Sequence, residues 1–129
     1  MITREQVTFT AQGDNFMPSK VGAPYSSAHD PGSIGQWGRY KGVPVPYGVA
    51  DFEAPEVEKD KILYLHRIVV PFLPAMRSAG AEEFRLHITY HYEDQCSIGF
   101  SREEARMISE LQCAVPIDCC RNEEPNHDT

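Results

Sequence analysis

The sequence lacks the apolar segments that would place it in a membrane. Its longest apolar stretch, Ile68 to Met76, is interrupted by Pro71 and Pro74. It is far shorter than the ~20 residues that a membrane-spanning helix requires. The first residues, MITREQVTF, contain no apolar run of the kind found in secretory signal peptides. We therefore expect a cytoplasmic protein that does not bind a membrane.

The spacing of cysteines that is typical of zinc sites is also missing. No C-x-x-C pair occurs, and the adjacent Cys119 and Cys120 would strain a disulfide and suit a zinc site poorly. We interpret the cysteines as small packing residues in a reducing compartment, with a metal or redox site as the minority interpretation. The four are Cys96, Cys113, Cys119 and Cys120.

Basic residues are scarce. The chain has 12 Lys and Arg residues and 19 Asp and Glu residues, which gives a formal net charge of -7. Residues 51–129 hold sixteen of the acidic and eight of the basic side chains. Such a surface repels phosphates and anionic lipids, so we expect no nucleic-acid partner. It would attract a basic protein, or it serves solubility alone.

Length and composition predict one globular domain. The chain has 129 residues, 41% of them hydrophobic and 24% charged. We expect a single α+β domain over residues 1–120 and a disordered polar tail over 121–129. Within the domain, residues 13–48 hold seven of the nine glycines and five of the ten prolines, and we expect a long loop there.

Two segments alternate apolar and polar residues with a period of two, which is typical of strands with one exposed face. One is residues 6–12, and the other, with the clearest pattern in the chain, is residues 84–92. In the second segment the polar side carries Arg85, His87 and His91. We expect these three side chains to remain exposed to water.

Weaker patterns predict three more strands. They cover residues 48–53, residues 96–100 and residues 115–119. Residues 96–100 would return beside the strand at 84–92 after a tight hairpin at Glu93–Gln95.

Two segments have the signals of helices. Residues 55–78 begin with Pro55 and carry apolar residues at spacings of three and four, with a kink expected near Pro71. A second helix follows Ser101, which forms a capping-box pattern with Glu104.

The order of these elements predicts the topology. From residue 48 onward it runs strand, helix, strand, strand, helix, strand, which is the split βαβ or ferredoxin-like pattern. The N-terminal strand would then be an extra strand at the edge. We expect an α+β fold whose antiparallel sheet has helices on one face and polar side chains on the other.

Four short motifs resemble a known family. They are GDNFMP at 13–18, GRYKG at 38–42, IGFS at 98–101 and VPID at 115–118. Together they resemble the bacterial domain-of-unknown-function 4279 family over roughly residues 5–120. Two departures are the weak helix after the first strand and the long Gly/Pro-rich segment. The resemblance implies an α+β fold in a cytoplasmic bacterial protein, and it supplies no established activity or catalytic residues.

No pattern indicates catalysis. The chain has no Ser or Cys nucleophile in a recognisable catalytic context and no phosphate-binding or kinase motif. His87 and His91 share a strand face but stand about 13 Å apart, too far to bind one metal ion. We therefore favour a non-enzymatic protein and predict no catalytic residues, no metal and no cofactor.

An acidic run lies where the strand at 48–53 meets the following helix. It consists of Asp51, Glu53, Glu56, Glu58 and Asp60. Asp51 and Glu53 share a strand face and could bind a cation, act as an acid/base pair or contact a partner. The alternative is a solvated helix start that the helix dipole stabilises.

A loop cluster completes the candidate surface. Trp37, Arg39 and Tyr40 are residue types that anchor protein interfaces, although Trp37 could instead fill the edge of the core. The predicted partner-binding residues are Trp37, Arg39, Tyr40, Asp51, Glu53, Glu56, Arg85, His87 and His91.

These features favour a non-enzymatic protein-binding domain. One specific form is a bacterial immunity protein that neutralises a basic toxin by covering its active site. The alternative is a small-molecule-binding or enzymatic domain whose pocket lies under the Gly/Pro-rich loop and includes Trp37, Tyr40 and Tyr47. A third possibility is a subunit that dimerises through its open sheet face.

Overall fold

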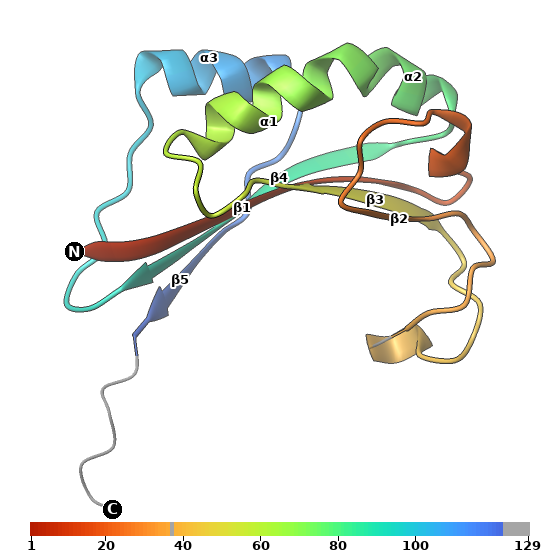
Figure 1. The fold of residues 1–129 in the computed structure, drawn as a ribbon, viewed down its shortest axis with the longest axis horizontal. Helices are drawn as coiled ribbons and strands as arrows, with labels where there is room; N and C mark the ends of the chain where they lie inside the picture. The colour runs from red at the N-terminus through yellow and green to blue at the C-terminus, as the bar shows by residue number, and fades with distance from the viewer. Residues whose placement is uncertain (37, 123–129) are drawn as a thin grey trace, which may run out of the picture.

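The computed structural model describes residues 1–36 and 38–122, and it contains one sheet with helices packed on it (Figure 1). The strands are β1 (Ile2–Gly13), β2 (Ser27–His29), β3 (Gly48–Glu53), β4 (Glu83–Tyr92) and β5 (Ile117–Arg121). The helices are α1 (Lys61–Val69), α2 (Leu73–Ser78) and α3 (Arg102–Glu110). Single 3-10 turns are η1 (Pro18–Lys20), η2 (Gly38–Tyr40) and η3 (Val70–Phe72).

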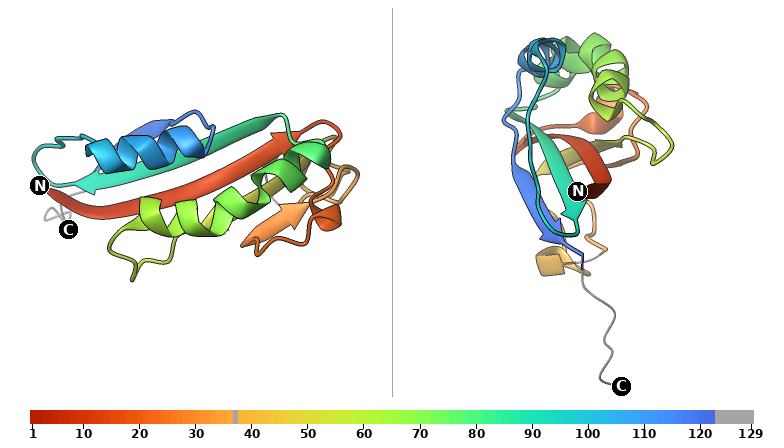
Figure 2. Two further views of the ribbon diagram at one scale, coloured as in Figure 1. Left: turned by 90° about the horizontal axis from the view of Figure 1, so that it is seen from above. Right: turned by 90° about the vertical axis from the view of Figure 1, so that its left-hand side faces the viewer.

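The sheet has one covered face and one open face. Its five strands lie in the order β2-β3-β1-β4-β5, antiparallel except for the parallel pair β4 and β5. All three helices lie on the same face, with α1 and α2 beside α3 (Figure 2). The expected α+β class is therefore confirmed. None of the helices in the described residues has the length and hydrophobicity to cross a membrane.

The N-terminal strand lies at the centre of the sheet, so its expected place at the edge is wrong. β1 pairs with β3 through Thr8–Gly13 and with β4 through most of its length. Its apolar side chains Val7, Phe9 and Ala11 are fully buried. A strand whose apolar face is fully buried is more stable with a neighbouring strand on each side, because both neighbours keep water away from the core.

The expected return strand at residues 96–100 is also wrong. These residues form no regular structure, because the free side of β4 is taken by β5, with Ile88 opposite Ile117. The hairpin at Glu93–Gln95 therefore has no partner strand, and the chain runs directly up to α3. The sheet is mixed rather than antiparallel, and the split βαβ arrangement is not confirmed.

The core lies between the sheet and the helices. Phe9 stacks on Phe84 with ring centroids 5.6 Å apart and meets the edge of Phe52 at 6.1 Å. The helices add buried side chains such as Leu65 and Met107. Each fully buried side chain of this size contributes about 1.5–3 kcal/mol relative to exposure.

Local signals set the ends of the helices. Oγ of Ser101 accepts the N–H of Glu104 at 3.0 Å, and Oε1 of Glu104 accepts the N–H of Ser101 at 2.9 Å, so the capping box is confirmed. The break at Pro71 is confirmed as well, because η3 separates α1 from α2. The first helix begins at Lys61, not at Pro55 as expected. Asp60 caps this start, because its side chain accepts a hydrogen bond from the N–H of Leu63.

The Gly/Pro-rich segment is more ordered than a simple loop. It contains β2, which pairs with β3, and a compact excursion, residues 30–36 and 38–46, that lies beside the open face at one end (Figure 1). Gly32 N–H donates to the carbonyl of Val45, and Val45 N–H donates to that of Ser33. Arg121, expected in the tail, is part of β5, and residues 123–129 lie outside the described residues.

Candidate functional site

The open face of the sheet carries a row of polar side chains that four strands supply. Ser27, Asp51, Thr10 and Arg85 are successive partners in the strand register. The Thr10 hydroxyl donates to Oδ1 of Asp51 at 2.6 Å, and the Ser27 hydroxyl donates to Oδ2 at 3.3 Å. Nη2 of Arg85 donates to Oε1 of Gln12 at 2.7 Å. These bonds hold the row in a fixed arrangement.

The two histidines of β4 lie on this face, as expected. His87 is exposed, and its Nε2 lies 2.5 Å from Oδ2 of Asp118 on β5. Nε2 of His91 lies 3.0 Å from Oε1 of Gln6 on β1. In both pairs the ring nitrogen is the donor, because a carboxylate oxygen and an amide oxygen can only accept. Within the described residues no group of three or more His, Cys, Asp or Glu is close enough to hold a metal ion.

The acidic run does not form one surface. Asp51 belongs to the polar row, whereas Asp60 is occupied as the cap of α1. Oε1 of Glu56 accepts from Nη2 of Arg4 at 2.7 Å and from Nε at 3.0 Å. The hydrogen bonds from Arg4 hold the pKa of the Glu56 carboxyl below its ordinary value. Asp60 thus has a structural role at the start of α1, whereas a functional role for Asp51 and Glu53, which share the open face of β3, stays a prediction.

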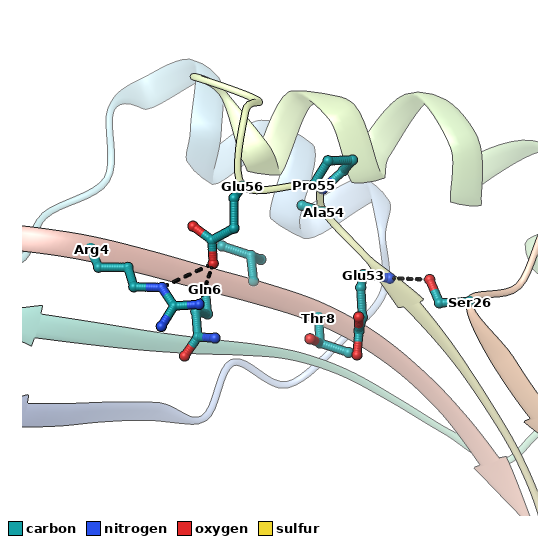
Figure 3. A pocket seen from close by; sticks show the side chains of 9 residues that line it. Arg4, Gln6, Thr8, Ser26, Glu53, Ala54, Pro55 and Glu56 are labelled. Carbon is teal, nitrogen blue, oxygen red and sulfur yellow. Dashed lines mark hydrogen bonds and ion pairs between the residues drawn. The ribbon is translucent and has the colours of Figure 1, made fainter.

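A cavity of about 480 Å³ lies beside β1, at the point where β1 extends past the end of its neighbour β3 (Figure 3). Because β1 pairs with β3 only from Thr8 onward, residues 2–7 have a neighbouring strand on one side only among the described residues. Figure 3 shows Arg4 reaching Glu56, while Glu53 lies beside Thr8. The cavity is lined by Arg4, Gln6, Val7, Thr8, Ser26 and residues 53–56.

A second cavity, of about 160 Å³, lies at the other end of the open face, between the sheet and the excursion formed by residues 30–36 and 38–46. We call it the loop pocket. The rings of Tyr40 and Tyr47 have centroids 6.0 Å apart and are inclined by 82°. The loop pocket is lined by Ser27, His29, Gly35, Gln36, Tyr40, Val45, Tyr47, Val49 and Asp51. The structure thus places a pocket under the Gly/Pro-rich segment, with two of the three aromatic residues expected there.

One pair of thiols lies close together. Sγ of Cys96, in the segment between β4 and α3, is 3.7 Å from Sγ of Cys119 on β5. Loss of solvation and the neighbouring Cys96 raise the pKa of the Cys119 thiol. Burial raises the pKa of the Cys113 thiol to about 11. No local pattern predicts this pair of thiols, because 23 positions in the chain separate its members.

The predicted partner-binding residues fall into three places. Arg85, His87 and His91 lie on the open face, as does Asp51, which also lines the loop pocket with Tyr40. Arg39 is exposed beside Tyr40, with its guanidinium carbon 5.7 Å from the ring centroid.

Two of the remaining residues, Glu53 and Glu56, line the cavity at the end of β3, and Trp37 lies outside the described residues. Sequence reasoning missed Asp118 and Arg4. The alternation of β1 gives the face of each side chain, but no pattern reveals which strand lies beside it.

No family model, no curated protein and no solved structure matches this chain. The resemblance to the domain-of-unknown-function 4279 family therefore stays a prediction.

Proposed function

We propose that this chain is a non-enzymatic domain that binds another protein through the open face of its sheet. The observation that carries the proposal is the asymmetry of the sheet: helices cover one face, while the other presents hydrogen-bonded polar side chains from all five strands. Such side chains lose little conformational freedom on binding, because they are already held in place.

The size of the open face supports this proposal. Five strands at about 4.8 Å spacing and about seven residues at ~3.3 Å each give a flat area of roughly 550 Å². A standard protein interface buries about 800 Å² on each partner. The open face together with the bordering segments therefore has the dimensions of one interface.

Charge indicates the kind of partner. The chain carries a net charge of -7, and a protein with this balance associates faster with a basic partner. We propose as the specific form an immunity protein that neutralises a basic toxin by occlusion. This form implies a cytoplasmic protein, because the toxin must be bound in the compartment in which it is synthesised.

Affinity capture from an extract of the native host tests the proposal. The tagged chain is used as bait at low salt and again at about 500 mM salt, where charge attraction is screened. We expect a basic protein to be retained at low salt and lost at high salt. Recovery of no protein partner at low salt would contradict protein binding as the function.

A second candidate rests on the loop pocket. A small-molecule-binding or enzymatic domain would use this cavity, which two tyrosines and Asp51 line. A ligand that binds the folded state raises the unfolding temperature, so thermal unfolding against a panel of metabolites and metal ions separates the two candidates.

A further inference from the structure

We infer that the loop pocket binds a cationic group, an ammonium or a guanidinium. This inference rests on the second candidate function, the use of the loop pocket, and adds the chemical class of its ligand. It does not depend on protein binding at the rest of the open face. Three observations lead to it: an acidic group that forms no ion pair within the part of the chain that the structure describes, aromatic walls, and the size of the cavity.

Asp51 supplies the negative charge. Its two oxygens accept from the hydroxyls of Thr10 and Ser27, which are neutral donors. Among the residues that the structure describes, no Lys, Arg or His forms an ion pair with Asp51. The carboxylate is therefore oriented by its neighbours, while no cation of residues 1–36 and 38–122 is paired with its charge. A cation bound in the pocket would form the ion pair that Asp51 lacks among the described residues.

Tyr40 and Tyr47 supply walls that suit a cation. Their rings stand nearly perpendicular, at 82°, and both line the cavity. The face of an aromatic ring attracts cations electrostatically, and aromatic cages for alkylated ammonium groups are built in this way. The chain already places one cation near such a face, because Arg39 lies over the Tyr40 ring. Arg39 is not among the residues that line the pocket.

The volume limits the ligand to a small group. About 160 Å³ is well below the ~300 Å³ at which drug-sized sites begin. One ammonium or guanidinium head with a few carbons fits this size. An anion would be repelled by Asp51.

Two sources offer this chemistry. The cation is either a free small amine or a Lys or Arg side chain of a protein that lies on the open face, because Asp51 and Ser27 belong to that face as well. The shared requirement is a positive head group, and the experiment below separates the two sources.

The test follows backbone amide signals by NMR at pH 8, where histidine side chains are ordinarily neutral. Butylammonium and tetramethylammonium are titrated as cations, with 1-butanol as the neutral control. We expect saturable shifts at residues that line the loop pocket, with dissociation constants in roughly the millimolar range for such small probes. The neutral probe should bind at least about tenfold more weakly.

Matched variants locate the binding. Asp51→Asn keeps the shape and removes the charge, and we expect butylammonium binding to weaken by about tenfold. Glu83→Gln removes a carboxylate from the same open face of the sheet outside the pocket, and should change binding by less than about twofold. Tyr47→Phe should retain binding, whereas Tyr47→Leu should lose severalfold. The amide spectrum of each variant shows whether it is folded.

A peptide arm identifies the source of the cation. A five-residue peptide with a central lysine is compared with its norleucine counterpart and with butylammonium. Tighter binding of the lysine peptide than of butylammonium indicates a protein-borne side chain, and weaker binding indicates a free amine.

The outcomes separate this inference from the function on which it rests. Equal binding of 1-butanol and butylammonium in the pocket would overturn the cationic class and leave a pocket for small molecules. An unchanged affinity in a folded Asp51→Asn variant would overturn the class too. Saturable binding of no probe at the pocket would overturn both the inference and the second candidate function.

Discussion

The hydroxyl of Thr10 donates a 2.6 Å hydrogen bond to Oδ1 of Asp51, and this bond joins β1 to β3 across the open face. Thr10→Val replaces the hydroxyl with a methyl of similar size, so the carboxylate loses one donor. We expect the free energy of unfolding to fall by about 1 kcal/mol, measured by urea denaturation.

Thr8→Val is the matched control, because Thr8 lies on the same strand and face and its hydroxyl is not part of this row. Its effect should be within about 0.5 kcal/mol of zero. Equal losses in the two variants would show that the bond between Thr10 and Asp51 adds no particular stability.

Burial should make Cys113 the slowest thiol to react. Its pKa is raised from 9.0 to about 11, so at pH 8 its thiolate fraction falls from roughly 10% to roughly 0.1%. We expect iodoacetamide to modify Cys113 about two orders of magnitude more slowly than the exposed Cys120, as followed by peptide mass spectrometry. In urea the two rates should become similar. A fast reaction of Cys113 in the folded protein would contradict its burial.

The proximity of Cys96 and Cys119 should direct oxidation. Their sulfurs are 3.7 Å apart, so a small movement allows a disulfide. The oxidant diamide takes up the two hydrogens that the thiols lose. We expect a crosslink between Cys96 and Cys119 as the first intramolecular product, detected by mass spectrometry without reduction. In a Cys96→Ser variant this crosslink cannot form, and we expect no disulfide between Cys119 and Cys120 in its place.

Tyr90 should make stability depend on alkaline pH. Its side chain is 6% exposed, and loss of solvation, with a smaller effect of nearby acidic groups, raises its pKa from 10.0 to about 12. A raised pKa in the folded state means that the protonated phenol contributes stability in full below about pH 10. That contribution is lost as the pH rises through about 12.

Tyr90→Phe removes this ionisation. Between pH 10 and 12 its free energy of unfolding should fall less steeply than that of the wild type, measured by urea denaturation at each pH. Parallel curves for wild type and Tyr90→Phe would show that Tyr90 titrates alike in the folded and unfolded states.

The sequence predicted the faces of the strands, the capped start of α3 and the break near Pro71, because local physics sets them. The alternation of β4 placed Arg85, His87 and His91 on the open side, and the pattern from Ser101 to Glu104 predicted a cap that the structure confirms. Each of these rests on a periodicity or a spacing of a few residues.

The neighbours of each strand could not be predicted in the same way. Alternation gives the face of a side chain but not the strand beside it, and β1 and β3 are separated by a long Gly/Pro-rich segment. For the same reason the pairing of His87 with Asp118 and the meeting of Tyr40 with Asp51 in the loop pocket were not foreseen. The segment at residues 96–100 has a strand-like alternation, but β5 already occupies the place that it would need.

The measurement that tests partner binding at the open face most directly compares two single-lysine variants as baits. Thr89→Lys adds a positive charge on the open face, and Ser109→Lys adds the same charge at an exposed position of α3 on the opposite side. Partner captured from host extract at low salt is quantified by mass spectrometry for both variants and the wild type. We predict that Thr89→Lys captures at least about tenfold less partner than the wild type, while Ser109→Lys captures as much as the wild type. Undiminished capture by Thr89→Lys, or loss confined to Ser109→Lys, would contradict the account.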